Sequence, residues 1–479
     1  MIKENLIFTF SGIRGVVGKH LNYEVAKKLA IAFGQYYKEN ERKIILGRDT
    51  RPSGEYLEKG IIEGLITTGF EVVNVGIIPT PVIFHAKTIN NIPAGIIITG
   101  SHNSQKWNGI KLLNSEGYLS NEDLSKISNL MKTISIKDYK VKSSEIKRKT
   151  TYFNPVPHYR EDLKKYIDFK TLKERNKLKV VIDTGAGAGK IVTPQLLQEL
   201  GCKVKLINNE FILKSSFPRE IEPVRKNLRD LIMEVWQGKC DIGFAHDSDA
   251  DRLAIVGDDG TCYPEDIGLA LIMDYYLKNI NQDNEKIIFV TNLASSLMFE
   301  VIADTYNAQV IRTPIGEVFL SNEITKILNK NKEAKRQSLV FGGEGSCGGI
   351  IFPLFNNTRD GIFAAAKIIE ILIKTELKVS ELVSKLPKFY SHRRLINTDN
   401  IDISFVISET KLALNEEGEE VVRINNDLRF GHDKEWFILI HPSNTEPVIR
   451  VISEAKSDSL ARVYCEATTE LIKLIINRI

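Results

Sequence analysis

The sequence Ile96-Ile-Ile-Thr-Gly-Ser-His-Asn-Ser-Gln-Lys-Trp-Asn-Gly-Ile-Lys111 joins an apolar run to a polar loop. Its first four residues predict a strand that is buried on both faces, and Gly100 predicts a sharp turn where that strand ends. Such a turn can hold the side chain of Ser101 in a cleft. Serine and asparagine also stabilise ordinary surface turns, so the stretch taken alone favours the ordinary turn.

Strands and helices alternate around this stretch. Residues 43–46 and 71–75 have the composition of strands, and residues 55–68 between them have the apolar spacing of a helix. This alternation predicts a mostly parallel sheet that is covered by helices on both faces. Sites in such sheets lie beyond the carboxyl ends of the strands, where the loops of Arg48 and Ser101 fall.

The same alternation of strands and helices continues through three successive parts of the chain, and the last part differs from them. We expect an α/β protein with three similar mixed α/β domains and a smaller C-terminal α+β domain around a central cleft. The expected domains cover residues 1–153, 154–260, 261–387 and 388–479. In the last domain, residues 436–440 and 448–452 are predicted strands and residues 457–476 a predicted helix.

The composition narrows the class of protein. The 479 residues are 43% apolar and 26% charged, and the formal net charge is +4. This charge is too small to indicate nucleic-acid or membrane-surface binding, and no apolar run reaches the ~20 residues that cross a bilayer. The five cysteines contain no CxxC pair, which is typical of reduced thiols. We therefore expect a cytoplasmic enzyme with a small-molecule substrate and no nucleic-acid or membrane partner.

A second stretch with chemical meaning is Asp247-Ser-Asp-Ala-Asp-Arg252, in which three carboxylates alternate with other residues. Carboxylates this close repel one another unless a cation lies between them, and oxygen ligands suit Mg²⁺, Mn²⁺ or Ca²⁺. An EF-hand would have glycine and a long carboxylate where this chain has Arg252 and Asp258. The flanking runs are β-like, so the pattern favours a loop that holds one Mg²⁺. A solvated acidic turn is the alternative.

A glycine-rich run, Gly185-Ala-Gly-Ala-Gly-Lys190, follows a predicted strand over residues 177–183. A Walker A loop needs glycine in place of Thr184 and a hydroxyl residue in place of Ile191, and the pattern GxGxxG needs glycine in place of Lys190. The run therefore favours a tight turn between strand and helix. A nucleotide site here is a minor alternative.

The two chemical stretches together contain the parts that phosphoryl transfer requires. A metal ion and Arg252 would neutralise charge on the phosphoryl oxygens. Ser101 can carry a phosphoryl group as a stable ester. Lys111 and Arg14 are candidates to act on a substrate hydroxyl by proton transfer or by electrostatics.

Two later loops offer groups that suit a sugar phosphate. A glycine-rich loop contains Glu344 and Ser346, which can bind sugar hydroxyls where the backbone approaches closely. The groups that suit a phosphate are the hydroxyls, amide and guanidinium of Ser443, Asn444, Thr445 and Arg450.

Taken in order, these loops resemble those of the α-D-phosphohexomutase family over essentially the whole chain. Thr99-Gly-Ser-His-Asn103, followed by Asn108-Gly-Ile-Lys111, is similar to the phosphoserine loop of that family, and Asp247-Ser-Asp-Ala-Asp-Arg252 to its metal loop. Gly343-Glu-Gly-Ser346 is similar to the sugar-recognition loop of the family, and Ser443-Asn-Thr-Glu-Pro447 is similar to its phosphate-binding loop. Shorter motifs also fit, namely Ser11-Gly-Ile-Arg-Gly15, Gly47-Arg-Asp-Thr-Arg51, Pro79-Thr-Pro81 and Glu222-Pro223.

The resemblance implies a phosphosugar mutase whose four domains carry, in chain order, the phosphoserine, metal, sugar-recognition and phosphate-binding loops. Ser101 would rest phosphorylated, with one Mg²⁺ per chain held by its phosphate and by Asp247, Asp249 and Asp251. The phosphoryl group would pass to a hexose monophosphate and give a hexose 1,6-bisphosphate, which serves as intermediate and activator. This bisphosphate would turn over and return its other phosphate to Ser101. The phosphosugar would be the partner of a monomer or homodimer.

The resemblance also implies roles for single residues. Arg14, His102 and Lys111 would assist catalysis beside Ser101. The residues implied in substrate binding are Arg252, Gly316, Glu344, Ser346, Ser443, Asn444, Thr445 and Arg450.

Three positions depart from the family pattern. Ser104 replaces the usual proline after the Ser-His-Asn triplet, and Gly348 stands where many members have a histidine, so the role of that histidine does not carry over. His441 replaces the usual arginine before the phosphate loop, and we expect weaker phosphate binding near neutral pH, where histidine is mostly neutral.

The form of the loops indicates a branch of the family. The sugar loop Gly343-Glu-Gly-Ser-Cys-Gly-Gly349 and the segment 107–114 are most similar to archaeal-type phosphoglucosamine mutases. Conversion of glucosamine 6-phosphate to glucosamine 1-phosphate is therefore the first expectation. A phosphomannomutase/phosphoglucomutase is the alternative within the family, and a non-catalytic sugar-phosphate-binding protein of the same fold is the alternative outside catalysis.

Overall fold

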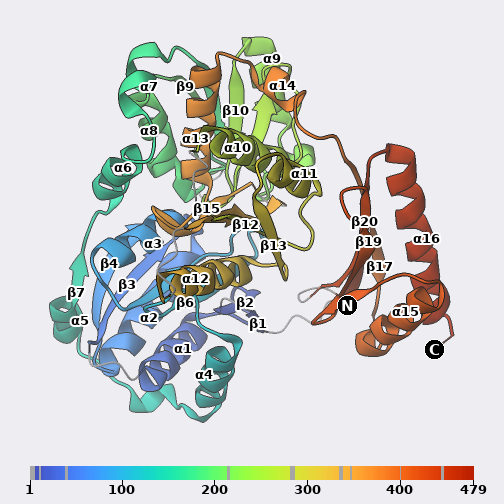
Figure 1. Ribbon diagram of the computed structural model, residues 1–479. Helices are drawn as coiled ribbons and strands as arrows, with labels where there is room; N and C mark the ends of the chain where they lie inside the picture. The colour runs from blue at the N-terminus through green and yellow to red at the C-terminus, as the bar shows by residue number, and fades with distance from the viewer. Residues whose placement is uncertain are drawn as a thin grey trace. The chain divides into compact units, whose positions relative to one another are not determined.

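The computed structural model describes residues 6–9, 12–37, 41–212, 216–280, 286–333, 338–345, 348–399, 401–443 and 447–478. The chain forms two compact units. Unit 1 is made of Met1–Lys3, Met273–Ser346 and Lys385–Ile479, and unit 2 of Glu4–Ile272 and Cys347–Ser384. The predicted fold class, three α/β domains and a smaller C-terminal α+β domain, is confirmed (Figure 1). The central cleft stays a prediction.

The first sheet belongs to unit 2 and has the strand order β1-β2-β6-β5-β3-β4-β7. Its strands are β1 (Ile7–Thr9), β2 (Gly12–Val16), β3 (Lys43–Arg48), β4 (Glu71–Ile77), β5 (Ala94–Ile98), β6 (Trp107–Leu113) and β7 (Thr150–Tyr152). β3 is parallel to β4 and β5, and β4 is parallel to β7. β6 is antiparallel to β5 and β2, and β2 is antiparallel to β1.

The prediction of a mostly parallel sheet is wrong for the half that carries Ser101. The chain between β5 and β6 has only the eight residues 99–106, which is too short for the crossover that a parallel neighbour needs. The chain therefore turns back and pairs antiparallel. As a result Lys111 on β6 lies opposite Ile97 on β5 and Gly12 on β2.

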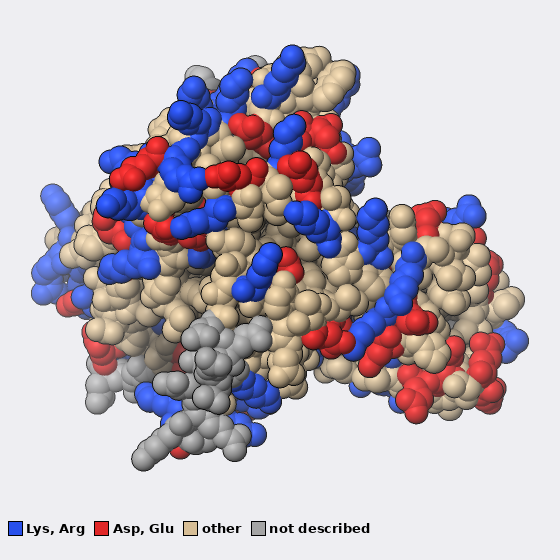
Figure 2. All heavy atoms as spheres, turned by 45° about the horizontal axis from the view of Figure 1, so that its top comes forward, with Lys and Arg blue, Asp and Glu red and all other residues tan. Residues whose placement is uncertain are grey.

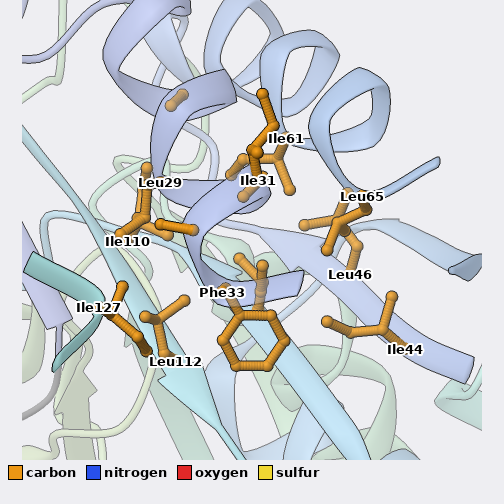
Figure 3. Packing of buried hydrophobic residues seen from close by; sticks show 14 of the residues in the cluster. Leu29, Ile31, Phe33, Ile44, Leu46, Ile61, Leu65, Ile110, Leu112 and Ile127 are labelled. Atoms are coloured by element: carbon orange, nitrogen blue, oxygen red, sulfur yellow. The ribbon is translucent and has the colours of Figure 1, made fainter. Parts of the chain in front are cut away.

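Helices cover this sheet and supply its core. They are α1 (Tyr23–Tyr36), α2 (Ser53–Thr67), α3 (Thr80–Ile89), α4 (Asn121–Thr133), the 3₁₀ turn η1 (Ile136–Asp138) and α5 (Ser143–Lys149). Side chains of α1, such as Phe33, lie over Ile44 and Leu46 of β3 and Leu112 of β6 (Figure 3). Ile44 and Leu46 are two residues apart and so face the same side of the sheet. All five residues of β5 are buried, as the apolar run predicts.

The second domain also lies in unit 2 and has the strand order β11-β10-β8-β9. Its elements are α6 (Val156–Lys164), α7 (Phe169–Arg175), β8 (Lys179–Asp183), η2 (Ala188–Ile191), α8 (Thr193–Glu199), β9 (Lys203–Ile207), η3 (Arg225–Asn227), α9 (Arg229–Gly238), β10 (Ile242–Ala245) and β11 (Ala254–Gly257). β8 is parallel to β9 and β10, whereas β10 and β11 are antiparallel. The loop between β10 and β11 contains the acidic stretch.

The third domain begins with α10 (Glu265–Asn279), and its later strands and helices are divided between the units. Unit 1 contains β12 (Lys286–Asn292), α11 (Met298–Thr305), β13 (Gln309–Thr313), α12 (Glu317–Glu333) and β14 (Ser338–Gly343). β12 is parallel to both β13 and β14. Unit 2 contains the antiparallel pair β15 (Ile350–Phe352) and β16 (Asn356–Asp360), followed by α13 (Gly361–Thr375) and α14 (Val379–Val383).

The C-terminal domain lies in unit 1 and is an antiparallel sheet with two helices. Its elements are β17 (Tyr390–Asn397), α15 (Ile403–Glu416), β18 (Val422–Ile424), β19 (Asp427–His432), β20 (Trp436–Pro442), β21 (Val448–Ala455) and α16 (Asp458–Ile476). The strand order is β17-β21-β20-β19-β18. One face packs against α15 and α16, and the other packs Phe437 and Leu439 against Leu293 and Leu297.

The surface carries both signs of charge. On the face drawn in Figure 2, Lys and Arg side chains lie among Asp and Glu side chains, in agreement with the net charge of +4. Within the described ranges, no helix combines the length and the apolar composition that a membrane crossing requires.

Candidate active site

Ser101 lies directly after β5, in the turn that leads to β6. Its side chain is 2% exposed, and its backbone has a φ of +47°, which is rare for a residue other than glycine. The backbone N–H of Ser101 donates to Oγ1 of Thr99 at 2.9 Å. The Ser101 hydroxyl donates to Oδ2 of Asp247 at 3.0 Å, and Nδ1 of His102 lies 3.4 Å from Oγ. The turn thus places this hydroxyl against the acidic loop.

The three aspartates of the acidic loop are buried together. Asp247, Asp249 and Asp251 are at most 1% exposed, and they offer ligand atoms that lie within 4.8 Å of one another. Oδ1 of each has no hydrogen-bond partner among the described residues. Buried carboxylate oxygens are normally paired, so three unpaired ones on one loop fit a divalent cation with oxygen ligands. The solvated acidic turn is excluded by this burial.

Burial raises the pKa of both Asp247 and Asp251, but the dominant neighbouring charges shift the pKa values of these two carboxyls in opposite directions. Burial, and then the charges of Asp249 and Asp251, raise the pKa of Asp247 well above its ordinary value. Burial would also raise the pKa of Asp251, but Arg359, Lys111 and Arg252 lower it well below that value. Asp247 is therefore the carboxyl group of the loop whose ionised form a bound cation would stabilise most.

Four cationic side chains lie around the acidic loop. Nζ of Lys111 lies 3.5 Å from Oδ2 of Asp249 and 3.6 Å from Oδ2 of Asp251. Nε of Arg252 lies 3.8 Å from Oδ2 of Asp247. The other two are Arg14, which donates to Oδ1 of Asn103 at 2.7 Å, and Arg359, which donates to Oδ2 of Asp251 at 2.5 Å.

Arg14 and His102 both have a lowered pKa. Burial lowers the pKa of Arg14, and the nearby charge of Arg252 adds to that effect. Burial likewise lowers the pKa of His102 well below its ordinary value, and Arg252 and Arg14 lower it further. His102 is therefore neutral near pH 7, so its imidazole can accept a hydrogen bond beside Ser101 and can take up a proton only as a weak base.

Two residues at this site were not predicted from the sequence. Arg359 lies on β16 and donates a hydrogen bond to Asp251, which is 108 positions away in the sequence. Thr80, at the start of α3, donates its hydroxyl to Oδ2 of Asp249 at 2.6 Å and its backbone N–H to the carbonyl of Asp249 at 3.0 Å. The motif Pro79-Thr-Pro81 marked the position of Thr80, but no local pattern assigns it a partner.

The glycine-rich run after β8 supports the acidic loop. The backbone N–H of Ala188 donates to the carbonyl of Ser248 at 2.8 Å. Nζ of Lys190 lies 3.1 Å from the carbonyl of Asn209 and 3.3 Å from a carboxylate oxygen of Glu210. The prediction of a tight turn between strand and helix agrees with the positions of β8, η2 and α8.

In unit 1 the structure brings together two residues of the predicted sugar loop region. Oε1 of Glu344 accepts a hydrogen bond from the backbone N–H of Gly316 at 2.9 Å and from Nδ2 of Asn292 at 3.0 Å. Glu344 is buried. Ser346, the third predicted residue of this region, lies outside the described residues.

The predicted phosphate loop joins β20 to β21 in unit 1. The backbone N–H of Ser443 donates to the carbonyl of Val448 at 2.9 Å, and Arg450 lies opposite His441 in the strand pairing. Nδ1 of His441 lies 2.7 Å from Oδ1 of Asp427. Asn444 and Thr445 lie outside the described residues.

The departure at Gly348 has a steric cause in unit 2. Gly348 has a φ of +69°, and a Cβ atom there would lie 2.1 Å from the carbonyl oxygen of Leu253. Neither histidine nor any other residue with a Cβ fits without a shift of the backbone. The Ser104 carbonyl, at the other departure in this unit, accepts a hydrogen bond from Arg51 at 3.0 Å.

Comparison with known proteins was made with the whole chain. Models of phosphoglucomutase/phosphomannomutase alpha/beta/alpha domains I, II and III match residues 5–138, 157–260 and 264–390. The chain belongs to the phosphoglucomutase/phosphomannomutase family. This family places it among the phosphohexomutases, which are isomerases of sugar phosphates.

Relatives of this phosphohexomutase cover nearly its full length. A phosphoglucomutase/phosphomannomutase of Thermococcus kodakarensis is 35% identical over 474 residues, which are 98% of each chain. A probable phosphoglucosamine mutase of Pyrococcus horikoshii is 34% identical over 472 residues, again 98% of each chain. The crystal structure of a putative phosphomannomutase from Thermus thermophilus has the same fold, with a TM-score of 0.79, 20% identity and coverage of 99% of this chain and 100% of that one.

Proposed function

We propose that this phosphohexomutase interconverts hexose 6-phosphates and hexose 1-phosphates through a phosphoserine at residue 101. The observation that carries the proposal is the contact between the buried Ser101 hydroxyl and Asp247, 3.0 Å apart at the edge of a buried acidic triad. A serine held in this way can exchange a phosphoryl group with a substrate. Arg14, Arg252, Lys111 and Arg359 surround the same position with positive charge.

The first half of the reaction moves the phosphoryl group from Ser101 to the sugar. A free hydroxyl oxygen of the hexose monophosphate forms the new bond to phosphorus, and the bond between phosphorus and Oγ of Ser101 breaks. Lys111 is assigned to proton transfer at the attacking hydroxyl, and Arg14 to stabilising the charge on the phosphoryl oxygens. The products are dephosphorylated Ser101 and a hexose 1,6-bisphosphate.

In the second half, the bond between phosphorus and Oγ of Ser101 forms again, and a bond between phosphorus and a sugar oxygen breaks at the other end of the sugar. The bisphosphate turns over and presents its second phosphate to Oγ of Ser101, which takes the phosphoryl group and gives up its proton. His102 is the nearest neutral base, with Nδ1 3.4 Å from this oxygen. The product is the positional isomer of the substrate, and Ser101 is phosphorylated again.

Asp247, Asp249 and Asp251 are proposed to hold one Mg²⁺. When bound, this ion would neutralise charge on the transferring phosphoryl group. Thr80 donates a hydrogen bond to Asp249 and Arg359 donates one to Asp251, and these contacts hold the two carboxylates in their orientation. Such contacts to ligand side chains commonly matter for affinity as well as for orientation.

Recognition of the sugar and of its distal phosphate is assigned to residues of unit 1. Gly316, Glu344 and Ser346 are proposed to bind sugar hydroxyls, because Glu344 is a buried carboxylate that already accepts from the Gly316 backbone. The distal phosphate is assigned to Ser443, Asn444, Thr445 and Arg450. In unit 2, Arg252 is proposed to bind the substrate.

Glucosamine 6-phosphate is the proposed substrate. Several archaeal relatives, 31–34% identical over nearly the whole chain, have the name probable phosphoglucosamine mutase, which supports this choice. The relative from Thermococcus kodakarensis, 35% identical, is a phosphoglucomutase/phosphomannomutase and supports the alternative. Retention of Ser101 and of all three aspartates disfavours a protein that only binds sugar phosphates.

The test of this proposal is a comparison of substrates with the purified full chain. Turnover is measured with Mg²⁺ and a trace of glucose 1,6-bisphosphate on glucosamine 6-phosphate, mannose 1-phosphate and glucose 1-phosphate. The readout is kcat/KM, since this ratio discriminates substrates. A clear preference for the amino sugar is expected. Equal rates on the other two would favour the broad-specificity mutase, and no turnover by folded, phosphorylated protein would overturn the mutase proposal.

A further inference from the structure

The motif Gly47-Arg-Asp-Thr-Arg51 begins in the last two residues of β3 and has no part in the reaction described above. Two of its charged residues, Asp49 and Arg51, are 0% exposed. Nε of Arg51 donates to Oδ2 of Asp49 at 3.1 Å, and the backbone N–H of Arg51 donates to Oδ1 at 2.9 Å. A fully buried ion pair is expensive to desolvate and needs further hydrogen bonds, which the remaining N–H groups of Arg51 provide.

Every remaining N–H group of the Arg51 guanidinium is directed into the loop that holds Ser101. The four acceptors are backbone carbonyls: Ser101 at 2.7 Å, Asn103 at 2.7 Å, Ser104 at 3.0 Å and Trp107 at 2.9 Å. A guanidinium has five donors in a rigid plane, whereas a lysine has three on one atom. One arginine thus fixes both ends and the middle of the loop.

Asp49 connects the same loop to the acidic loop. Its Oδ2 accepts from the hydroxyl of Thr99 at 2.8 Å and from the hydroxyl of Ser248 at 2.8 Å. The Ser248 hydroxyl also lies 2.8 Å from the carbonyl of Ser101. Ser248 stands between Asp247 and Asp249, so one buried carboxylate joins the serine turn to the centre of the proposed metal loop.

The local sequence is built around this arginine. A Cβ atom on Gly100 would lie 2.6 Å from Cζ and 2.7 Å from Nε of Arg51. Glycine at position 100 therefore lets the guanidinium lie flat against the backbone, immediately before the residue whose φ is +47°. Such a conformation persists only where the surroundings over-determine it, and the carbonyl contacts of Arg51 supply that constraint.

We propose that Arg51 and Asp49 are positioning residues that hold Ser101 in its strained conformation and in register with the acidic loop. The proposal rests on the function proposed above and names what aligns its phosphoryl carrier. Arg51 contacts no reacting atom, and its effect acts through the backbone of residues 101–107. Loss of the clamp should therefore lower the rate of phosphoryl transfer and leave metal binding and substrate KM nearly unchanged.

A second buried pair provides a comparator with a different expected effect. Nε of Arg219 donates to Oδ1 of Asp183 at 2.9 Å, and Nη2 donates to the carbonyl of His246 at 2.7 Å. This pair therefore holds the start of the acidic loop and makes no contact with the serine turn among the described residues. Its loss should weaken metal binding first.

The experiment compares the full-length variants Arg51→Lys and Arg219→Lys with the control Arg48→Lys. Arg48 lies in the same motif, but it donates from Nε to Glu58 at 2.7 Å, outside the serine turn. The measurements are amide hydrogen exchange in peptides covering residues 98–108, the rate at which glucose 1,6-bisphosphate phosphorylates Ser101 (followed by intact mass), the kcat and KM of the mutase reaction, and Mn²⁺ affinity. The first and last need no catalytic turnover.

For Arg51→Lys we expect faster exchange in residues 98–108 and about 100-fold slower phosphorylation and kcat, because small misplacements of a reacting group cost this much. Its KM and Mn²⁺ affinity should stay within about threefold of the wild-type values, well short of the 10–100-fold loss that outer-shell changes cause in metal affinity. Arg219→Lys should lose about tenfold or more in Mn²⁺ affinity. Arg48→Lys should match the wild type in every one of these measurements.

If hydrogen exchange and Ser101 phosphorylation in Arg51→Lys proceed at the wild-type rates, the positioning role is overturned. The phosphoserine mechanism is not affected by that result. A wild-type protein that takes no phosphoryl group at Ser101 would overturn the proposed function, and the positioning role with it. If Arg51→Lys fails to fold, Gly100→Ala replaces it, since the new Cβ displaces the guanidinium while Arg51 is retained. The same criteria then apply to that variant.

Discussion

The hydroxyl of Ser101 donates to Oδ2 of Asp247 across 146 positions of sequence, at a distance of 3.0 Å. The two residues come from different domains of unit 2, one from the turn after β5 and one from the loop after β10. Their contact brings the proposed phosphoryl carrier to the proposed metal loop. The Oδ1 atoms of all three aspartates have no hydrogen-bond partner among the described residues, which fits the proposed cation as their partner.

Replacing Asp247 by asparagine should stabilise the metal-free protein. Burial and the charges of Asp249 and Asp251 disfavour ionised Asp247, so a neutral isostere removes repulsion while its carbonyl oxygen still accepts from Ser101. We expect the Tm without metal to rise by about 2–4 °C, which corresponds to about 1 kcal/mol in a large domain. Mg²⁺ should raise the Tm of the wild type only, because it binds the folded state. An Asp247→Asn protein that is less stable without metal would contradict this account.

Replacing Arg359 by glutamine should have the opposite effect on the metal-free protein. Arg359 donates to Oδ2 of Asp251 at 2.5 Å and lowers the pKa of that carboxyl. Removing one partner of a buried pair leaves an uncompensated charge and typically costs about 3–5 kcal/mol. We expect a lower Tm without metal and a larger rise on addition of Mg²⁺ than in the wild type. Thermal unfolding with EDTA and with Mg²⁺ measures both, and equal Tm values for variant and wild type would count against the pairing.

Gly348→Ala should destabilise the protein more than Gly418→Ala. Both glycines have a positive φ, so each substitution carries the backbone strain of about 1–2 kcal/mol. Only at Gly348 does the new Cβ also meet a backbone atom, the carbonyl oxygen of Leu253 at 2.1 Å, whereas nothing lies within 4 Å at Gly418. Denaturation midpoints of the two variants provide the measurement. Equal losses would show that position 348, where many family members have a histidine, has room for a side chain in this chain.

Asp360 should make stability fall as the pH rises from about 4 to about 6. Burial raises its pKa from 3.8 to about 6, although hydrogen bonds from Phe363 and Tyr159 partly oppose this. The folded state therefore binds a proton more tightly than the unfolded state. The stabilisation is complete below the unfolded pKa, is lost as the pH passes the folded pKa, and amounts to about 3 kcal/mol. The Tm difference between Asp360→Asn and wild type should thus shift in favour of the variant between pH 4 and 7, and parallel curves would refute the assignment.

Much of the fold could be predicted from the sequence because its elements have strong local signals. The strands predicted over residues 43–46 and 71–75 begin where β3 and β4 begin and end two residues before them, and the helix predicted over residues 457–476 begins one residue before α16. β6 was not predicted, because Trp107–Leu113 was interpreted only as part of a loop motif. α4 was also missed, although Leu124, Ile127 and Met131 have helical spacing and are buried.

The candidate site could be predicted where residue type and spacing are unusual, as in the alternating aspartates and in Ser101. The outer contacts could not be predicted in the same way. Thr80 reaches Asp249 across 169 positions, and Arg359 reaches Asp251 across 108. Neither a single threonine nor a single arginine indicates its partner, since the pairing arises only when the domains of unit 2 fold together. The motif of Asp49 and Arg51 was visible, but its four carbonyl acceptors were not.

The most direct test of the central claim is the fate of a phosphoryl group on Ser101 in a single turnover. Phosphorylated protein is mixed with a stoichiometric amount of glucosamine 6-phosphate and Mg²⁺, without added bisphosphate, and is analysed by intact mass and by the phosphopeptide that contains residue 101. We expect the phosphopeptide to decrease as glucosamine 1,6-bisphosphate forms and to return as glucosamine 1-phosphate forms, and we expect Ser101→Ala to take up no phosphoryl group. Conversion of the sugar phosphate by Ser101→Ala at the wild-type rate would contradict the account.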